Sequence, residues 1–405
     1  MEEWKEYKAI DFCENVTDGT HDSPKPVDEG HYLITSKHLQ KNSIDFSSAY
    51  KISETDYLKV IQRSRVVQYD ILFSMIGTIG NTVRVISPDI DFAVKNMAIF
   101  KMGGDNLKSK WLYYWLQSNT AKEYIYSRLS GSTQSYLTLD SLRNFPVYAP
   151  SENKMRMIVE LLSSLDDKID LNNHINHNLE QQAQTLFKSW FVDFEPFKQE
   201  RFVNTEMGLI PKDWSIVPFF DIVRLCSGGT PKTEQPDYWG GNIPFFTPKD
   251  VSISPFCLKT EKYITKSGLD HCNSHLYEPF TTFITARGTV GRLCMAGYPM
   301  AMNQTNYAIC SISIDPILAF LFSKQIVNNL KNKANGAVFD AITTRDFEGE
   351  RIIMAPENIL SKFSSTIRPL YNQILENEKQ SLELAKTRDL VLPALMTGQT
   401  INHNC

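Results

Sequence analysis

Two stretches of the chain carry apolar residues at alternating intervals of four and three, the spacing of a coiled-coil seam. In residues 158–190, eight of the ten seam positions are apolar, and in residues 363–395, seven of the ten are. Each stretch follows an Ala-Pro dipeptide. The pattern predicts long helices over residues 151–192 and 356–398, and ~37 residues of helix span about 55 Å.

Both seams are interrupted by asparagine at equivalent positions, Asn172 and Asn377. A buried polar residue in a seam lowers stability but fixes the register and the partner of the helix. We therefore expect the two helices to pair with each other, antiparallel; an ordinary helical hairpin or a dimerisation zipper is the alternative. The predicted helix-pairing positions are Leu162, Leu165, Ile169, Asn172, Leu179, Leu186, Ile367, Leu370, Ile374, Asn377, Leu384 and Val391.

The segment before the second helix repeats the segment before the first, at an offset of about 210 residues. Gly-Thr-Ile-Gly at residues 77–80 corresponds to Gly-Thr-Val-Gly at residues 288–291, and each directly follows a strand-like run. We expect both to be tight strand-to-strand turns, in which glycine supplies a positive φ. Helical patterns over residues 108–129 and 316–334 also correspond.

Short β-type runs and helical stretches alternate within each repeat, which predicts a mixed α+β fold. We expect two pseudo-symmetric globular domains separated by a pair of long antiparallel coiled-coil helices. The predicted division is domain 1 over residues 1–150, a first helix over 151–192, a linker over 193–211, domain 2 over 212–355, a second helix over 356–398 and a tail over 399–405.

Composition is that of an ordinary globular protein, with 42% hydrophobic and 22% charged residues and a formal charge of −4. The acidity is concentrated in residues 151–211, so each large domain is near neutral and can present a basic face. No stretch approaches the ~18 apolar residues of a membrane span. Seven scattered cysteines without a CxxC pair predict reduced thiols in a cytoplasmic protein.

Signals for catalysis are weak. Neither glycine turn extends to a phosphate loop or a dinucleotide-binding fingerprint. Asn-Ile-Pro-Phe at residues 242–245 is one residue short of the motif with which methyltransferases hold a flipped base. His271, Cys272 and His275 lack a second ligand cluster, so a solvated loop is favoured over a metal site. We therefore predict a non-catalytic reader of DNA, without a metal.

Polar loops at matching places in both repeats are the candidate DNA contacts. Asn and Gln can bind adenine, Arg and Lys can bind guanine, and Ser and Thr can bind phosphate. The candidates are Thr20, His21, Ser36, Lys37, Thr78, Asn81, Arg84, Asn96, Ser132, Thr133, Gln134, Thr230, Lys232, Thr247, Lys249, Arg287, Thr289, Arg292, Asn303, Gln304 and Asn335. The other hypotheses are a stand-alone methyltransferase or nuclease with a helical dimerisation arm, and a structural hub that binds only proteins.

The stretch LDDKIDLNNHINHNLEQQAQTLFKSWFVDFEPF at residues 165–197 resembles the central region of type I restriction–modification specificity subunits. ELAKTRDLVLPALMTGQ at residues 383–399 resembles the end of their second helix. The resemblance covers essentially the whole chain. It also places Trp190, Phe191 and Phe194 where the chain leaves the first helix for domain 2; plain core packing is the alternative for these side chains.

The resemblance implies two target-recognition domains, each reading one half of a split, asymmetric site in double-stranded DNA, with the helix pair setting the distance between them. It implies two modification subunits that methylate adenine and dock beside the helices, and restriction subunits that translocate and cut unmodified DNA. No cofactor is then expected in this chain. The methyl donor, ATP and Mg²⁺ are expected on the partner subunits.

Overall fold

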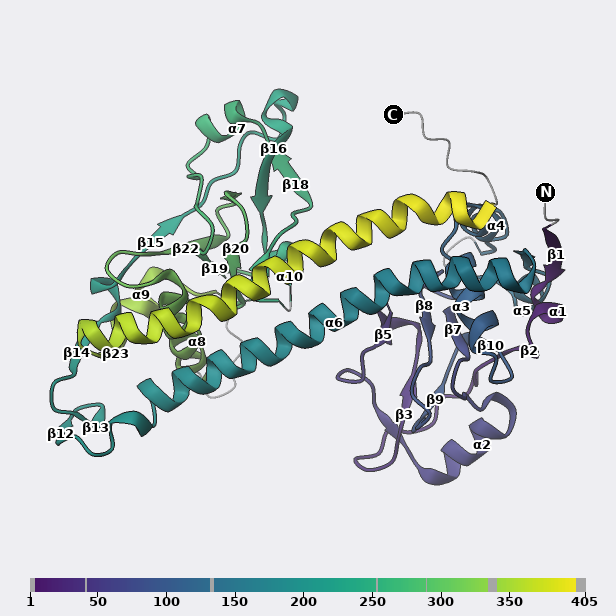
Figure 1. The fold of residues 1–405 in the computed structure, drawn as a ribbon, viewed down its shortest axis with the longest axis horizontal. Coiled ribbons are helices and arrows are strands. Elements are labelled where there is room, and N and C mark those ends of the chain that lie inside the picture. Colours follow the sequence, from purple (N-terminus) through teal and green to yellow (C-terminus); the bar gives the residue numbers. More distant parts are fainter. Residues whose placement is uncertain are drawn as a thin grey trace. The chain divides into compact units, whose positions relative to one another are not determined.

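The chain divides into two compact units: unit 1 contains residues 1–169 and 383–405, and unit 2 contains residues 170–382. The computed structural model describes residues 4–40, 42–131, 135–252, 254–288, 290–333 and 341–397. Each unit holds one globular domain and a part of each of two long helices, α6 (Glu152–Phe191) and α10 (Glu357–Thr397) (Figure 1). The two predicted long helices are thereby confirmed.

Domain 1, the globular part of unit 1, is built on an antiparallel sheet in the order β2-β10-β7-β8. A smaller sheet, β6-β3-β9, has β3 antiparallel to β6 and parallel to β9. Strands β7 and β10 read as unbroken apolar runs because both of their faces are buried. The strands are β1 (Lys5–Lys8), β2 (Asn15–Asp18), β3 (His31–Ile34), β4 (Leu39–Gln40), β5 (Ser43–Ile44), β6 (Lys51–Ile52), β7 (Ile71–Ser74), β8 (Thr82–Arg84), β9 (Phe92–Val94), β10 (Met97–Lys101) and β11 (Pro146–Ala149). The helices are α1 (Ala9–Phe12), η1 (Ser36–His38), α2 (Glu54–Ser64), α3 (Asn106–Trp115), α4 (Asn119–Ser127) and α5 (Leu139–Arg143).

Domain 2, the globular part of unit 2, repeats this plan. Its main sheet, β15-β22-β19-β20-β17, has the strand order of domain 1 with β17 added at one edge. In its smaller sheet, β16 is antiparallel to β18 and parallel to β21, as β3 is to β6 and β9. The strands are β12 (Phe202–Thr205), β13 (Gly208–Pro211), β14 (Ser215–Pro218), β15 (Val223–Ser227), β16 (Trp239–Phe246), β17 (Phe256–Cys257), β18 (Lys262–Ile264), β19 (Thr282–Thr285), β20 (Leu293–Ala296), β21 (Ala301–Met302), β22 (Asn306–Ser311) and β23 (Arg351–Met354). The helices are η2 (Glu195–Phe197), η3 (Phe219–Asp221), η4 (Pro236–Tyr238), η5 (Pro248–Asp250), α7 (Lys266–Asp270), α8 (Pro316–Lys333) and α9 (Thr344–Glu348). The predicted internal repeat and mixed α+β fold are confirmed.

Both Gly-Thr-x-Gly segments join antiparallel neighbours, β7 to β8 and β19 to β20. Gly77, Gly80, Gly288 and Gly291 all have positive φ, between 74° and 94°. These are the tight turns that the sequence predicts, and they use the backbone region that glycine enters without strain.

One predicted helix is wrong. The pattern over residues 108–129 is split into α3 and α4, because Ser118 leaves the helical conformation and its Oγ accepts a hydrogen bond from the Ala121 amide at 3.2 Å. Serine in this role begins a new helix. The corresponding stretch of domain 2 is the uninterrupted helix α8.

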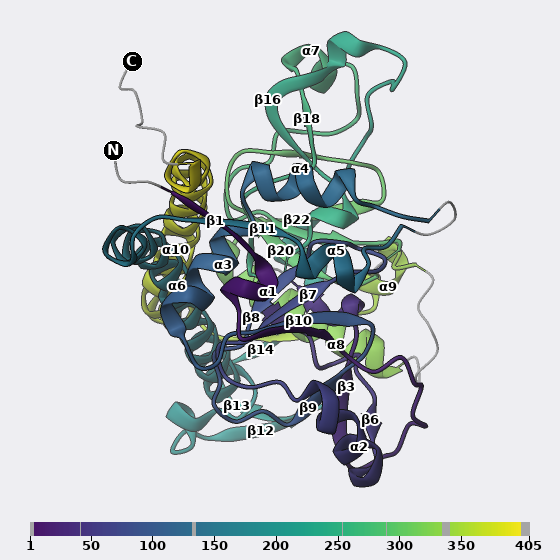
Figure 2. The ribbon, with the colours of Figure 1, turned by 90° about the vertical axis from the view of Figure 1, so that its right-hand side faces the viewer.

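In unit 1 the beginning of α6 packs against the end of α10 (Figures 1 and 2). Met155, Ile158 and Leu162 share one apolar core with Leu392 and Met396. Further along, the buried guanidinium of Arg388 lies 2.5 Å from Asp166 Oδ1, and the Tyr114 hydroxyl donates to the other oxygen of that carboxylate at 2.7 Å. The two helix segments therefore run antiparallel.

In unit 2 the second half of α6 packs against the first half of α10, and a cluster of buried amides lies near the middle of both helices. Asn172 Nδ2 donates to Gln380 Oε1 at 2.9 Å and to Ser381 Oγ at 3.1 Å. Asn377 Nδ2 donates to Asn176 Oδ1 at 2.8 Å. All the predicted pairing positions in both units are buried or half-buried. The amides link the helices in one register, because a shift of either helix would break several of these bonds.

Aromatic side chains join the end of α6 to the beginning of α10 and to domain 2. Phe191 lies on Phe363 with ring centres 4.8 Å apart, and Phe194 lies on Trp214 at 5.3 Å. Trp190 also packs on Phe363. Phe194 has a φ of 52°, a conformation that a large side chain adopts only when its surroundings hold it. These residues form part of the core of unit 2.

No helix in the described part of the chain is long and apolar enough to cross a membrane. The cysteines among the same residues are free.

Candidate nucleic-acid interface

Domain 1 brings Thr20, His21 and Asn96 together at the end of β2. His21 Nδ1 lies 2.9 Å from Asn96 Oδ1, and Nε2 lies 2.8 Å from Asp18 Oδ2. Asn96 has a φ of 53°, in the left-handed region that asparagine tolerates. Asp18 is nearly buried, whereas 64% of the His21 side chain is exposed. The hydrogen bonds to Asn96 and Asp18 therefore fix the orientation of the His21 ring, and most of the side chain is exposed to solvent.

Close approach of the backbone explains the glycine in this loop. A Cβ on Gly19 would lie 2.3 Å from the carbonyl oxygen of Val94. The Thr20 amide donates to that oxygen at 3.0 Å. The Thr20–His21 loop is therefore fixed against β9.

Ser36 and Lys37 lie on η1, the turn that follows β3. Thr35 and His38 cap this turn reciprocally, so its backbone is satisfied internally. Ser36 Oγ is 3.5 Å from the Asn96 carbonyl oxygen, which joins η1 to the His21 loop, and Lys37 is exposed. These residues extend the polar surface around His21.

Asn81 and Arg84 make contacts inside domain 1, and the DNA contact predicted for them stays a prediction. Asn81 Nδ2 donates to the Leu39 carbonyl at 2.9 Å. The Arg84 guanidinium lies over the Tyr69 ring and donates to Ser109 Oγ at 3.0 Å, and burial lowers its pKa. Both side chains stabilise the domain. Thr78, at the tip of the same turn, is exposed.

Domain 2 has a matching loop at Thr230. The Thr230 hydroxyl donates to Gln304 Oε1, and both residues are exposed. A Cβ on Gly229 would lie 2.5 Å from the Asn273 amide nitrogen, so here too the loop touches backbone. Asn303 is different, because its Oδ1 accepts from Thr305 Oγ1 and from an adjacent asparagine side chain. Asn303 therefore shapes the turn, and its DNA contact stays a prediction.

The remaining candidates divide into three groups. The Thr247 hydroxyl donates to Asp250 Oδ2 inside its own turn at 2.7 Å, and its contact with DNA stays a prediction. The candidate cations of domain 2, all of them exposed, are Lys232, Lys249, Arg287 and Arg292. The candidates outside the described residues are Ser132, Thr133, Gln134, Thr289 and Asn335.

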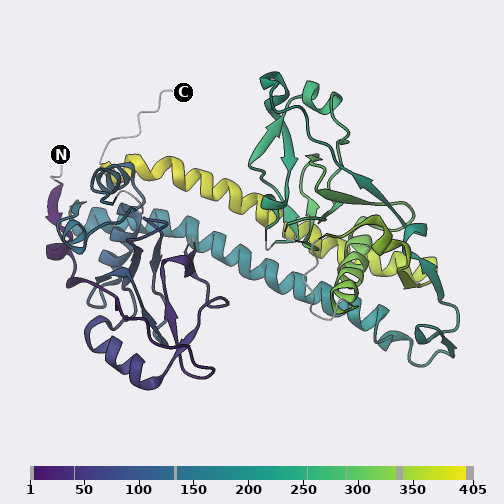
Figure 3. The ribbon, with the colours of Figure 1, turned by 180° about the vertical axis from the view of Figure 1, so that it is seen from behind.

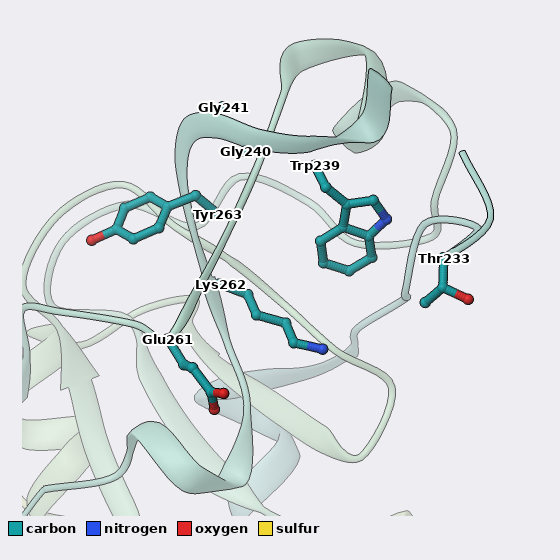
Figure 4. Close-up of a pocket in the computed structure, with 7 residues that line it drawn as sticks. All are labelled: Thr233, Trp239, Gly240, Gly241, Glu261, Lys262 and Tyr263. Atoms are coloured by element: carbon teal, nitrogen blue, oxygen red, sulfur yellow. The ribbon is translucent and has the colours of Figure 1, made fainter. Parts of the chain in front are cut away.

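An open cleft of about 540 Å³ is lined by residues of β16 and β18 in domain 2 and by the loop at Thr233 (Figure 4). Its lining residues are Thr233, Trp239, Gly240, Gly241, Glu261, Lys262 and Tyr263. Trp239 Nε1 donates to the Lys232 carbonyl at 3.2 Å, and the Lys262 ammonium lies 5.5 Å from the indole centre. The sequence prediction did not include this cleft. The sequence feature that could have indicated the cleft is the Gly-Gly pair after Trp239, because glycine inside a strand often marks a bulge. Strand β16 has a bulge at this place.

His271 and His275 are placed by aromatic neighbours. His271 stacks on Tyr238 with ring centres 5.0 Å apart, and His275 packs against Tyr277. Within the described ranges, no group of three or more His, Cys, Asp or Glu side chains is arranged to hold a metal ion.

The duplicated domains, the paired helix segments and the polar loops at matching places define a class: a protein with two recognition domains on one chain. The chain belongs to the family described as type I restriction modification DNA specificity domain, which matches residues 1–181 and 211–384.

Among its relatives is the type I restriction enzyme MjaIX specificity subunit of Methanocaldococcus jannaschii, 31% identical over 313 residues, with 73% of this chain and 70% of the relative covered. The type I restriction enzyme HindI specificity subunit of Haemophilus influenzae is 22% identical, with 98% of this chain and 100% of the relative covered. A crystal structure of a type I restriction-modification S subunit from M. genitalium has a TM-score of 0.57 at 13% identity, covering 97% of this chain and 96% of that one, and shows the same fold. The comparisons do not favour the stand-alone enzyme that the sequence left open.

Proposed function

We propose that this chain is the non-catalytic subunit that selects the DNA sequence for a type I restriction–modification complex. Domain 1, residues 1–150, reads one half of a split site in double-stranded DNA, and domain 2, residues 212–355, reads the other half. The duplication carries the proposal. Both domains have the same strand order, whereas the loops at Thr20 and Thr230 differ in sequence. Two different half-sites in one chain make an asymmetric target.

The same proposal assigns the chemistry to partners. Two modification subunits methylate adenine with the methyl donor, and restriction subunits use ATP and Mg²⁺ to translocate and cut. The complex works in the cytoplasm. In this chain the exposed polar groups around His21 and Gln304 meet base edges, and the exposed cations of domain 2 meet phosphates. Phosphate contacts position a protein on DNA, and base contacts give sequence specificity.

A methylome tests the proposal. The chain is co-expressed with the modification subunit of its own system in a host without DNA methylation, and modified adenines are mapped. The expected result is a motif of two short half-sites around a fixed spacer, absent when the modification subunit is expressed alone. Identical methylation without this chain, or none with it, refutes the proposal.

A further inference from the structure

Helix α2 of domain 1 presents a face that the function described so far does not use. Four of its side chains, spaced three and four residues apart, point away from the domain: Thr55, Leu58, Lys59 and Gln62 are all exposed. Leu58 is 48% exposed in the middle of this face. The face therefore combines an amide, a hydroxyl, an ammonium and an apolar group, which are side-chain types that contact base edges and phosphates.

Capping and packing contacts fix helix α2 to domain 1. Ser53 caps its first turn, and Val60 and Tyr57 pack into a small core with Leu33 and Ile52. His31, on β3, stacks on Tyr57 with ring centres 3.9 Å apart. A recognition element needs such rigidity, because each side chain must meet a base edge at hydrogen-bonding distance.

The charges of α2 are sorted along its length. Its acids, Glu54 and Asp56, lie in the first turn and are engaged: His31 Nε2 is 2.5 Å from Glu54 Oε2, and Ser53 Oγ donates to Asp56 at 2.9 Å. Its cations, Lys59 and Arg63, lie in the second half. Their acidic neighbours are Asp22, in an exposed pair with Lys59 at 3.7 Å, and the nearly buried Asp18. An exposed pair of this kind is weak and yields readily to a phosphate.

Arg63 connects α2 to the candidate DNA loop. Its Nη2 donates to Asp18 Oδ1 at 2.6 Å and to the Gly19 carbonyl at 3.2 Å. Asp18 also holds His21. The exposed face of α2 and the Thr20–His21 loop are therefore neighbouring parts of one surface. This surface lies on the side of domain 1 away from α6 (Figures 1 and 3).

The corresponding element of domain 2 lacks the second half of this helix. Both helices follow equivalent strands and both have a hydroxyl cap, Ser53 for α2 and Thr265 for α7. However, α7 ends at Asp270 after five residues, whereas α2 has eleven. Lys59, Gln62 and Arg63 belong to the part that only α2 has. This difference is expected where two domains of one framework read different sequences.

We propose that α2 is the recognition helix of domain 1 and lies in the major groove of the half-site that domain 1 reads. The proposal rests on the function proposed above. The groove admits an α-helix, a glutamine amide pairs with adenine N6 and N7, and Leu and Thr methyl groups contact the thymine methyl. Gln62 makes no hydrogen bond to another described residue, so its amide is available for a base. Lys59 contacts phosphate, and Arg63 positions the helix on the His21 loop.

The test is the methylome of the complex with single variants of this chain. Gln62→Ala is expected to relax one or two positions in one half-site, with discrimination there reduced on the order of 10- to 100-fold, while the other half-site and the spacer stay unchanged. Lys59→Ala is expected to keep the motif and lower the extent of methylation at every site. Lys122→Ala, exposed on α4 of the same domain, is the control and should behave as wild type.

The other outcomes are distinct. A wild-type motif with Gln62→Ala, or a partial loss of methylation that is equal at all sequences and leaves the motif unchanged, overturns base reading by α2. Absence of a split motif with the wild-type chain refutes the proposed function instead. If Gln62→Ala abolishes all methylation, Gln62→Glu decides, because it keeps the length of the side chain: a wild-type motif overturns the proposal, and a motif altered in one half-site supports it. The unchanged second half-site serves as the internal check that the variant is folded.

Discussion

The carboxyl group of Glu378 is the best-placed titratable group for a quantitative test of the packing in unit 2. It projects from α10 into the interface with domain 2, where the Ser254 hydroxyl donates to its Oε1. Burial raises the pKa of Glu378 from 4.5 to about 7; the Ser254 bond acts in the opposite direction, and the charge of Glu180 on α6 adds to the rise. Glu180 itself is paired with Lys324 of α8 at 2.6 Å.

The sign of the effect follows from linkage. Because the pKa of Glu378 is higher in the folded protein, the folded state binds the proton more tightly than the unfolded state does. The resulting stability is fully present below pH 4.5 and is lost as the pH rises through about 7. At 1.36 kcal/mol for each pKa unit, the difference between pH 4.5 and pH 8 corresponds to a loss of about 3 kcal/mol.

Replacing the carboxyl group with an amide removes this pH dependence. Glu378→Gln is expected to stabilise the chain by about 3 kcal/mol at pH 8.5 and by less than about 1 kcal/mol at pH 4.5. Urea unfolding at both pH values, followed by the fluorescence of Trp190 and Trp214 in the same unit, measures the difference. The control is Glu376→Gln, exposed on the same helix. If the two variants gain equally at pH 8.5, or neither gains, the reasoning is refuted.

Three further predictions concern the helix pair and the loops. Arg388→Met should lower the free energy of unfolding by about 3–5 kcal/mol, because it leaves the Asp166 carboxylate buried without its cation. A thermal melt checks this, with Lys386→Met, at an exposed position of the same helix, as the control. Equal melting temperatures for the two variants contradict the prediction. Asn377→Ala should cost about 1–3 kcal/mol in urea unfolding, because it removes the donor to the buried Asn176 Oδ1; an unchanged midpoint would show that the amide cluster does not stabilise unit 2. Gly229→Ala should weaken recognition of the domain 2 half-site in the methylome, because the added Cβ would lie 2.5 Å from a backbone atom. A Cβ at Gly349 would meet open space, so Gly349→Ala should leave the motif intact. Equal behaviour of the two variants would contradict the prediction.

The framework was predictable because local patterns determine it. The seam spacing gave both long helices, and the repeat at about 210 residues gave the duplicated domain. The glycine turns were predictable for the same reason, because positive φ at Gly77 and Gly288 follows from the residue type. The break at Ser118 was missed because serine is compatible both with a helix interior and with a helix cap. Tertiary packing then decides between the two.

The interface was predictable only in part. Asn81 and Arg84 have the side chains that read DNA, but contacts with Leu39 and Ser109 occupy them. These contacts join residues that are 42 and 25 positions apart, and single-sequence patterns do not report such pairs. The link from Arg63 to Asp18, 45 positions away, was invisible for the same reason.

The two domains are alike at glycines that touch neighbouring backbone and differ in exposed elements. Gly19 and Gly229 touch neighbouring backbone, so a side chain there would displace the loop whatever DNA sequence the domain reads. The outer face of α2 is exposed, so under the proposal above substitutions on it change the DNA sequence that is read without loss of the fold. The two domains differ at these places: domain 1 has the eleven-residue helix α2, and domain 2 has the five-residue helix α7 and the bulged strand β16 beside an open cleft. If α2 reads DNA as proposed, the residues that fold domain 1 and those that read DNA are largely separate, and a duplicated framework of this kind can then acquire two unrelated half-sites.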